Sequence, residues 1–223
     1  MNAARSDVRM VGTTSSVGGV LGKVRIIGEC EMYSDTDCTR LNCVGEAKVQ
    51  GHLRVEGTLK LTGECKITGA LQAGEIRGTG NLEIQSGIRG DVLKFSGNLD
   101  TDGDCELEKA DLSGAFRVAG LLNAGRLNLN MYGPCRAQEI GGGFIRIRKS
   151  KVATMKGWIN SDGAARLHAR VIEGDIVELH HTDAGIVRGN RVIIGAGCKI
   201  GRIEYRQELR VDRHSEVKER VQL

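Results

Sequence analysis

The sequence predicts an all-β fold, namely a single-stranded, right-handed parallel β-helix of triangular cross-section with about 17 residues per coil. Three observations predict it. Glycine recurs at every sixth residue between Gly45 and Gly69, apolar and polar residues alternate between these glycines, and a longer repeat runs through the chain. Alternation with a period of two is typical of strands with one buried face. Glycine accepts the positive φ that a sharp corner between short strands requires.

The composition agrees with densely hydrogen-bonded strands. The 223 residues include 32 glycines and a single proline, a residue that would remove a ladder donor. Aromatic residues make up only 3% of the chain, so the core must consist of small aliphatic side chains and cysteine. The seven cysteines include no CxxC motif, and we expect them to be unpaired core residues in a reducing cytoplasm. The net charge of +4 does not indicate a nucleic-acid-binding protein.

The longer repeat defines the coil. The stretch GEAKV at residue 45 is followed by GECKI at 63, GNLEI at 80, GNLDT at 97, GAFRV at 114 and GPCRA at 133. We expect further units to start at residues 150, 167, 184 and 201. In these units Ala169, Ile186 and Ile203 would share one core position, and Ile176 and Ile193 another. One such unit buries too little surface to fold alone, so the units must stack. A coil that is not a strict multiple of the hexapeptide favours the right-handed form.

The predicted organisation is a flexible N-terminal tail over residues 1–21, a continuous β-helix over 22–217 and a C-terminal tail over 218–223. The repeat is clearest over residues 45–125. Neither end shows a recognisable cap, and an uncapped β-helix edge can pair with another chain. We therefore expect end-to-end self-association through apolar residues of the terminal coils: Val24, Ile26, Ile203, Tyr205, Leu209 and Val211.

His180 and His181 form the most enzyme-like feature, because left-handed β-helix acyltransferases use a histidine as a base. No nucleophile or oxyanion motif accompanies them, so we expect surface histidines at a corner. Asp100, Asp102 and Asp104 do not fit a calcium loop. The spacing of Cys30, Cys38 and Cys43 does not fit a zinc site. We expect no metal, no cofactor and no enzymatic activity.

The stretch FIRIRKSK is a basic strand that carries Arg146, Arg148, Lys149 and Lys151. Arg146 and Arg148 would share one face of the strand. This face could dock an acidic partner, an anionic lipid or a phosphate backbone, or it could simply be solvated.

The Gly-x-[Leu/Cys/Ala]-x-[Val/Ile] repeat follows a polar N-terminal segment and includes GHLRVEGTLKLTG and GALQAGEIRGTGNLEI. It resembles bactofilins, the polymer-forming cytoskeletal proteins of bacteria, most clearly from Gly45 to Gly125. The resemblance implies a right-handed β-helix whose protomers form filaments without nucleotide and act as scaffolds for cell-shape, wall or appendage proteins. The chain departs from the family pattern in having about twice as many coils and no strong apolar anchor in its N-terminal segment.

The expected function is that of a cytoplasmic, self-assembling cytoskeletal scaffold. Its expected partners are itself, a paralogue and client proteins, with peripheral contact to the inner face of the cell membrane and no nucleic acid. Two alternatives stay open. One is a left-handed β-helix acyltransferase-like enzyme, which strict hexapeptides and a histidine between subunits would favour. The other is a monomeric β-helical binding rod, which the assembly state would distinguish from a polymer.

Overall fold

The computed structural model describes residues 5–150 and 165–223, in which strands and turns occur but no α-helix. These residues fall into two compact units, Met1–Leu107 (unit 1) and Glu108–Leu223 (unit 2), and each unit is described on its own. Within each unit the strands are parallel, and each pairs with the next strand along the chain. Parallel pairing in chain order, one coil after another, confirms the all-β parallel β-helix.

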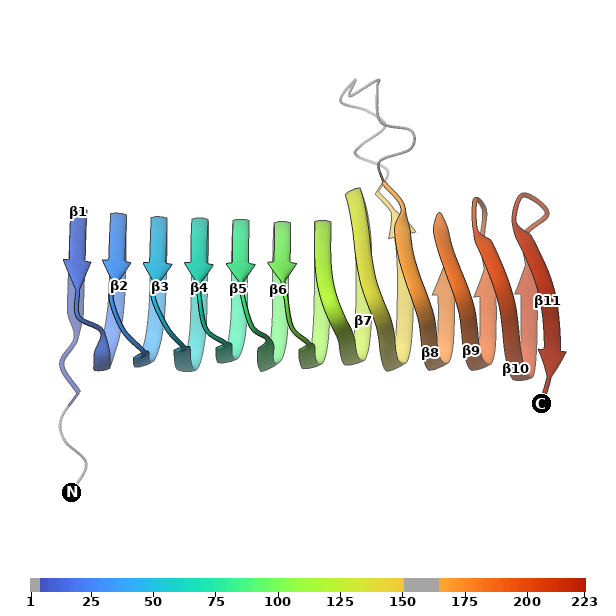
Figure 1. Ribbon diagram of the computed structural model, residues 1–223, viewed down its shortest axis with the longest axis horizontal. Coiled ribbons are helices and arrows are strands. Elements are labelled where there is room, and N and C mark those ends of the chain that lie inside the picture. Colours follow the sequence, from blue (N-terminus) through green and yellow to red (C-terminus); the bar gives the residue numbers. More distant parts are fainter. Residues whose placement is uncertain (1–4, 151–164) are drawn as a thin grey trace. The chain divides into compact units, whose positions relative to one another are not determined.

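Unit 1 contains six strands, and its register advances by nearly equal steps, since Gly28 pairs with Gly45 and Gly45 pairs with Gly63. A coil is one long strand that bends at its corners, followed by a short turn, as the ribbons of β2 to β6 show (Figure 1). The predicted length of the repeat is therefore confirmed in this unit. The strands are β1 (Val8–Ser16), β2 (Gly19–Met32), β3 (Thr36–Val49), β4 (Leu53–Ile67), β5 (Leu71–Ile84) and β6 (Ile88–Thr101).

Unit 2 is less regular. It contains most of β7 (Cys105–Lys149), together with β8 (Leu167–Leu179), β9 (Thr182–Ile194), β10 (Lys199–Val211) and β11 (Glu216–Gln222). From Cys135 to its partner Leu167 the chain advances by nearly two of the usual coils, whereas from Leu167 to Thr182 it advances by less than one. The shorter step arises because β8 has only 13 residues and a short turn, His180–His181, separates it from β9.

These two irregularities correct the predicted register of unit 2. Residues 135–147 pair directly with residues 167–179, and the unit that we expected to start at residue 150 lies almost wholly outside the described residues. Ala169 pairs with Ala184, and Ile203 pairs with Val187, so the core position predicted for Ala169, Ile186 and Ile203 was wrong. The position predicted for Ile176 and Ile193 was also wrong, because these residues align with Arg191 and Glu178.

The predicted tails were too long at both ends. Val8–Ser16 form β1 and pair with Val24–Met32, so the β-helix begins inside the segment predicted to be a flexible tail. β11 likewise extends to Gln222. The physical reason is the same at both ends. The neighbouring strand presents a row of backbone donors and acceptors, and an extended segment of even weak alternation satisfies them by pairing.

One column of glycines forms a corner of unit 1. The column contains Gly12, Gly28, Gly45, Gly63, Gly80 and Gly97, which pair with one another in register and all have positive φ. At Gly63 the φ is +127°, and a Cβ would lie 2.0 Å from the carbonyl oxygen of Gly45. Gly57 and Gly69 belong to the same hexapeptide pattern but do not have φ in the left-handed region. The glycines therefore mark corners as predicted. In this column the backbone demands glycine in one coil after another, whereas elsewhere in the hexapeptide pattern a positive φ occurs only at Gly51, with φ of +134°.

The core consists of columns of side chains that point inward from equivalent positions on successive strands. One such column in unit 1 contains Cys30, Ala47, Cys65, Leu82 and Leu99, all of which are buried. All seven cysteines are free and buried, which confirms their prediction as small core residues. Burial raises the pKa of the Cys65 thiol to about 12, because the thiolate would lose its hydration.

Candidate functional site

The N-terminal edge of the described β-helix is β1, not β2. We predicted Val24 and Ile26 as residues of an exposed end, and this was wrong, because β2 is paired with β1 on one side and β3 on the other. Both side chains are fully buried in the core. The inward positions of β1 are occupied by Val8 and Met10 in the first half of the strand and by polar hydroxyl residues in the second half, Thr14 and Ser16.

The C-terminal edge is divided between two strands. β11 pairs with Lys199–Tyr205 of β10, so Glu208–Val211 of β10 pair only with β9 among the described residues. Ile203 is fully buried beneath β11, which corrects its assignment to an exposed end. Tyr205 pairs with Gln222 and is half-buried.

Leu209 and Val211 are the two predicted association residues that the structure does place at an uncovered edge. They align with Val192 and Ile194, whose side chains are buried at 0% and 1% exposure. Leu209 and Val211 themselves are half-exposed, because no described strand covers them. Leu209 and Val211 therefore form a partly exposed apolar surface where the core ends.

A charged side chain follows on β11. Arg220 aligns with Ile203 and Val187, both fully buried, yet Arg220 itself is exposed. An arginine at the end of an apolar column opposes further stacking at that position. Apolar contact at this edge is therefore left to Leu209 and Val211 of β10 and to Val217 of β11, which aligns with the buried Ile200 and is half-exposed.

The predicted basic strand is largely engaged with an acidic residue of the next coil. Arg146 donates from Nε and Nη2 to Glu178 at 2.7 and 3.1 Å, and Arg148 donates to the same carboxylate at 3.3 Å. These arginines hold the pKa of Glu178 below its usual range. Arg146 also lies 4.8 Å from the ring centre of Phe144, and Arg126 lies 5.1 Å from it. Lys149 is half-buried at the end of β7, and Lys151 lies outside the described residues.

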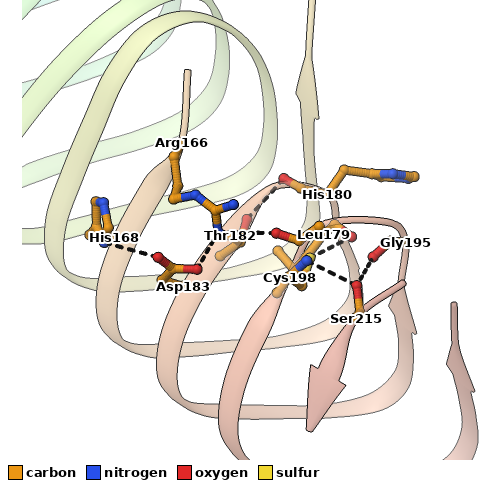
Figure 2. Close-up of polar contacts among 10 residues, drawn as sticks. Arg166, His168, Leu179, His180, Thr182, Asp183, Gly195, Cys198 and Ser215 are labelled. Atoms are coloured by element: carbon orange, nitrogen blue, oxygen red, sulfur yellow. Dashed lines mark hydrogen bonds and ion pairs between the residues drawn. The ribbon is translucent and has the colours of Figure 1, made fainter. Parts of the chain in front are cut away.

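His180 and His181 occupy the turn between β8 and β9, which confirms the prediction of histidines at a corner. The ring of His180 packs on Gly195, where a Cβ would lie 2.0 Å from the ring, and it points away from Asp183 and Cys198 (Figure 2). His181 has a φ of 50° and packs on Gly197. Burial lowers the pKa of His181, and the charges of Lys149, Arg166 and His180 lower it further.

Polar groups near this corner are used to hold neighbouring coils together. Arg166 and His168 both contact the carboxylate of Asp183, the histidine at 3.5 Å (Figure 2). The hydroxyl of Ser215 donates to the carbonyl of Gly195 at 2.6 Å and accepts from the amide of Cys198 at 2.9 Å. The Cys198 thiol is buried and its pKa is raised, mainly by desolvation. The arrangement contains a His–Asp pair, but the neighbouring hydroxyl and thiol are committed to backbone contacts.

The metal-binding patterns considered from the sequence do not assemble. In the described part of the chain, no group of three His, Cys, Asp or Glu side chains is placed to hold a metal ion. Asp102 and Asp104 lie exposed in the turn between β6 and β7, as expected for a solvated corner.

A groove of about 580 Å³ in unit 2 was not predicted. Its floor is a second glycine column, in which Gly142 pairs with Gly174 and Gly174 with Gly189. Arg188 contacts two acidic residues of its wall, Glu204 at 2.7 Å and Glu173 at 3.5 Å. The missing glycine side chains create the hollow, and its lining is net acidic, because it contains four carboxylates (Glu139, Glu173, Asp175 and Glu204) and two guanidiniums (Arg188 and Arg206).

Two columns of like charge on unit 1 were also missed. One contains cations (Arg9, Arg25, Lys60, Arg77 and Lys94), and the other contains carboxylates (Glu29, Glu46 and Glu64). Each coil contributes at most one charged residue to a column, and these residues occupy equivalent positions on successive strands. The signal is therefore present in the sequence once the coil length is known.

The geometry defines the class of protein as a parallel β-helix whose described residues carry ordered core columns, two partly uncovered edges and charged outer faces. Comparison with curated proteins finds two similar chains in Bacillus subtilis (strain 168). One is the uncharacterized protein YhbF, 43% identical over 107 residues, which are 47% of this chain and 42% of the relative. The other is the uncharacterized protein YhbE, 35% identical over 111 residues, which are 48% and 45% of the two chains. The chain thus covers less than half the length of the curated relatives it matches.

No protein-family model matches the chain, and no solved structure matches it. None of the described residues belongs to a helix that could cross a membrane.

Proposed function

We propose that this chain is a non-enzymatic structural protein that assembles end to end and serves as a scaffold for other proteins. The observation that carries the proposal is the pair of partly uncovered strand edges. β1 pairs only with β2, and Glu208–Val211 of β10 pair only with β9, among the described residues. Each edge presents unpaired backbone donors and acceptors beside inward-pointing apolar side chains.

A strand of a second copy would supply hydrogen-bond partners to such an edge and would also cover its apolar side chains. Parallel pairing would give partners to the backbone groups of the edge, and it would cover Leu209 and Val211 at one end and Val8 at the other. Completing the burial of one half-exposed side chain of this size contributes on the order of 1 kcal/mol. The polar positions Thr14, Ser16 and Arg220 would direct the contact to the apolar half of each edge.

The resemblance of the repeat to bactofilins supports the remaining parts of the proposal. We propose that assembly needs neither nucleotide nor metal, and that the polymer is cytoplasmic and peripheral to the cell membrane. It would position client proteins for cell shape, wall or appendage assembly, and a paralogue could co-assemble with it. The basic strand would offer such clients Arg148, whose guanidinium shares the carboxylate of Glu178 with Arg146.

The proposal is tested by negative-stain electron microscopy of the purified chain without nucleotide or added metal, with light scattering in parallel. The wild type should form filaments. Leu209→Arg and Val8→Arg should each shorten or abolish them, because a charge would be buried at the contact, while the β-type circular dichroism spectrum stays unchanged. Gln207→Arg, at an exposed position of the same strand, is the matched control and should leave filaments intact. A wild type that stays monomeric at high concentration would refute the proposal, as would normal filaments in both edge variants.

A further inference from the structure

The outer face of unit 1 carries a straight column of positive charge, which we name the cation ladder. It consists of Arg9, Arg25, Lys60, Arg77 and Lys94, which occupy equivalent outward positions on β1, β2, β4, β5 and β6, while Asn42 holds the place on β3. All five cations are exposed. Among the described residues only Arg77 has an ion pair, with Glu75 at 2.5 Å. Stacked strands place neighbouring rungs about 4.8 Å apart.

A column of like charges at this spacing works against the fold. Directly adjacent like charges on paired strands destabilise a sheet. Outward positions tolerate any polar residue, and the equivalent position on β3 is the neutral Asn42. The repulsion would be relieved by an anionic partner with negative charges at a matching spacing.

Such a surface exists on the same unit, on the other side of the glycine corner. The acid ladder consists of Glu29, Glu46 and Glu64, each of which directly follows a glycine of the corner. Glu46 and Glu64 each contact a single lysine, Lys48 at 2.8 Å and Lys66 at 2.9 Å. Glu29 has no cationic partner among the described residues.

A hollow of about 340 Å³ opens at the start of the acid ladder. Glu29, Glu31 and Glu46 line it together with Tyr33, which is 52% exposed, and with Lys48, the partner of Glu46. Three carboxylates against one lysine, beside an aromatic ring, leave net negative charge for an incoming arginine or lysine side chain.

We infer that copies of this chain associate side by side, with the cation ladder of one copy facing the acid ladder of the next. The two ladders have the same spacing because both are set by the stacking of strands. Charges therefore stay in step over successive coils when the coil axes of two copies are parallel or antiparallel. A partner without this repeat would match at single rungs only.

An apolar strip supplies the centre of this lateral contact. Val11, Ile27 and Val44 occupy one outward column between the cation ladder and the glycine corner. Val11 is 58% exposed and Val44 is 47% exposed. An apolar centre bordered by charged residues is the usual composition of a protein interface. Each copy offers both ladders, so the contact is heterologous and can repeat sideways. It uses the flank of unit 1 rather than the strand edges, and it does not depend on end-to-end assembly.

The test reverses charges in each ladder and then combines the variants. In Lys60→Glu/Lys94→Glu two carboxylates flank the remaining cation Arg77, and in Glu29→Lys/Glu64→Lys two ammonium groups flank the remaining acid Glu46. In each variant alone, the changed ladder of one copy faces an unchanged ladder of the next copy, and like charges meet at the two altered positions. In the mixture, the changed cation ladder of one variant can face the changed acid ladder of the other, and opposite charges then meet at all three positions.

The matched control is Arg54→Glu/Arg89→Glu. Both residues are exposed, both align with Gln72 in a separate column, and the net charge changes as much as in the lysine variant. Arg89 contacts Glu106 at 2.9 Å and Arg54 contacts Asp37 at 3.9 Å, so the control also removes two exposed ion pairs, and any loss of association in it is an upper limit for the effect of total charge.

Sedimentation velocity gives the strength of association, and the width of particles in electron micrographs distinguishes side contacts from end contacts. We expect each ladder variant to weaken side association at least about tenfold, a change that corresponds to about 1.4 kcal/mol. The mixture should recover it, and the control should match the wild type. Raising salt from about 0.05 to 0.5 M should also weaken it, since exposed charges are then screened. An unrestored mixture, or a control as weak as the ladder variants, would overturn the inference. So would loss of polyphosphate or anionic-vesicle binding in Lys60→Glu/Lys94→Glu without loss of side association.

Discussion

Replacing Gly63 by alanine should damage the β-helix far more than the same change at Gly57, although the two glycines belong to one hexapeptide pattern. Gly63 has a φ of +127°, where an L-residue is strained by about 1–3 kcal/mol. An alanine Cβ would also lie 2.0 Å from the Gly45 carbonyl oxygen, so the two strands must separate locally. Losing one or two ladder hydrogen bonds costs about 1 kcal/mol each. The sum is about 2–5 kcal/mol.

Two further glycines separate these contributions. At Gly57 the φ is outside the left-handed region and the nearest atom to a Cβ is the Thr39 carbonyl oxygen at 3.1 Å. Gly57→Ala should therefore be close to neutral, because the reduced entropy of the unfolded chain, about 0.4–1 kcal/mol, offsets the tight contact. At Gly12 the φ is +81° with nothing within 4 Å, so Gly12→Ala should show the backbone strain alone.

The assay is urea unfolding followed by far-ultraviolet circular dichroism, with the three variants compared at equal concentration. The expected order of midpoints is wild type and Gly57→Ala highest, Gly12→Ala lower and Gly63→Ala lowest. If Gly57→Ala lost as much stability as Gly63→Ala, the corner would not be set by backbone conformation. If Gly12→Ala matched Gly63→Ala, the close approach of neighbouring glycines would contribute nothing.

Two other predictions concern side chains. Thiol reagents should not modify the native protein at neutral pH, because all seven cysteines are buried and the Cys65 thiol has a pKa of about 12. In urea all seven cysteines should react. Rapid labelling of the native protein would contradict the packed core. The pKa of His181 is lowered in the folded state, so the unfolded chain binds the proton more tightly, and stability should fall as the pH drops below the usual histidine value of 6.5. His181→Asn keeps a residue that tolerates positive φ, and its midpoint should match the wild type at pH 8 but decline less at pH 5. An unchanged slope would show that another group causes the decline.

The coils of unit 1 could be predicted from the sequence because two independent periods coincide there. The alternation assigns Leu59 and Leu61 to the interior, where both are fully buried, and the glycines fix where the chain turns. In unit 2 the corners are less consistently marked by glycine, and the turn at His180–His181 is one residue shorter than the turns that follow β2, β3, β4 and β5. A register extrapolated at a constant coil length therefore drifts, as it did for Ile186 and Ile203.

The residues at the uncovered strand edges were harder to predict, because which strand lies at an edge depends on a pairing that is remote in sequence. Val24 and Ile26 looked terminal until β1 covered them, and β1 itself is polar in its second half, with Thr14 and Ser16 at the inward positions. Leu209 and Val211 were placed correctly because their alternation continues beyond the last marked corner. The cation ladder was not predicted, because Lys60, Arg77 and Lys94 are ordinary surface residues when considered singly. They form a column only once the pairing register of the strands is known.

The direct pairing of residues 135–147 with residues 167–179 has a practical consequence. These strands pair although the chain between partners is nearly twice as long as in other coils, so their pairing tolerates a connection longer than one coil. A fluorescent protein or an affinity tag inserted between Ser150 and Ala165 should therefore leave the flanking strands paired. That corner offers a place for a reporter that marks the protein internally and leaves both strand edges untouched.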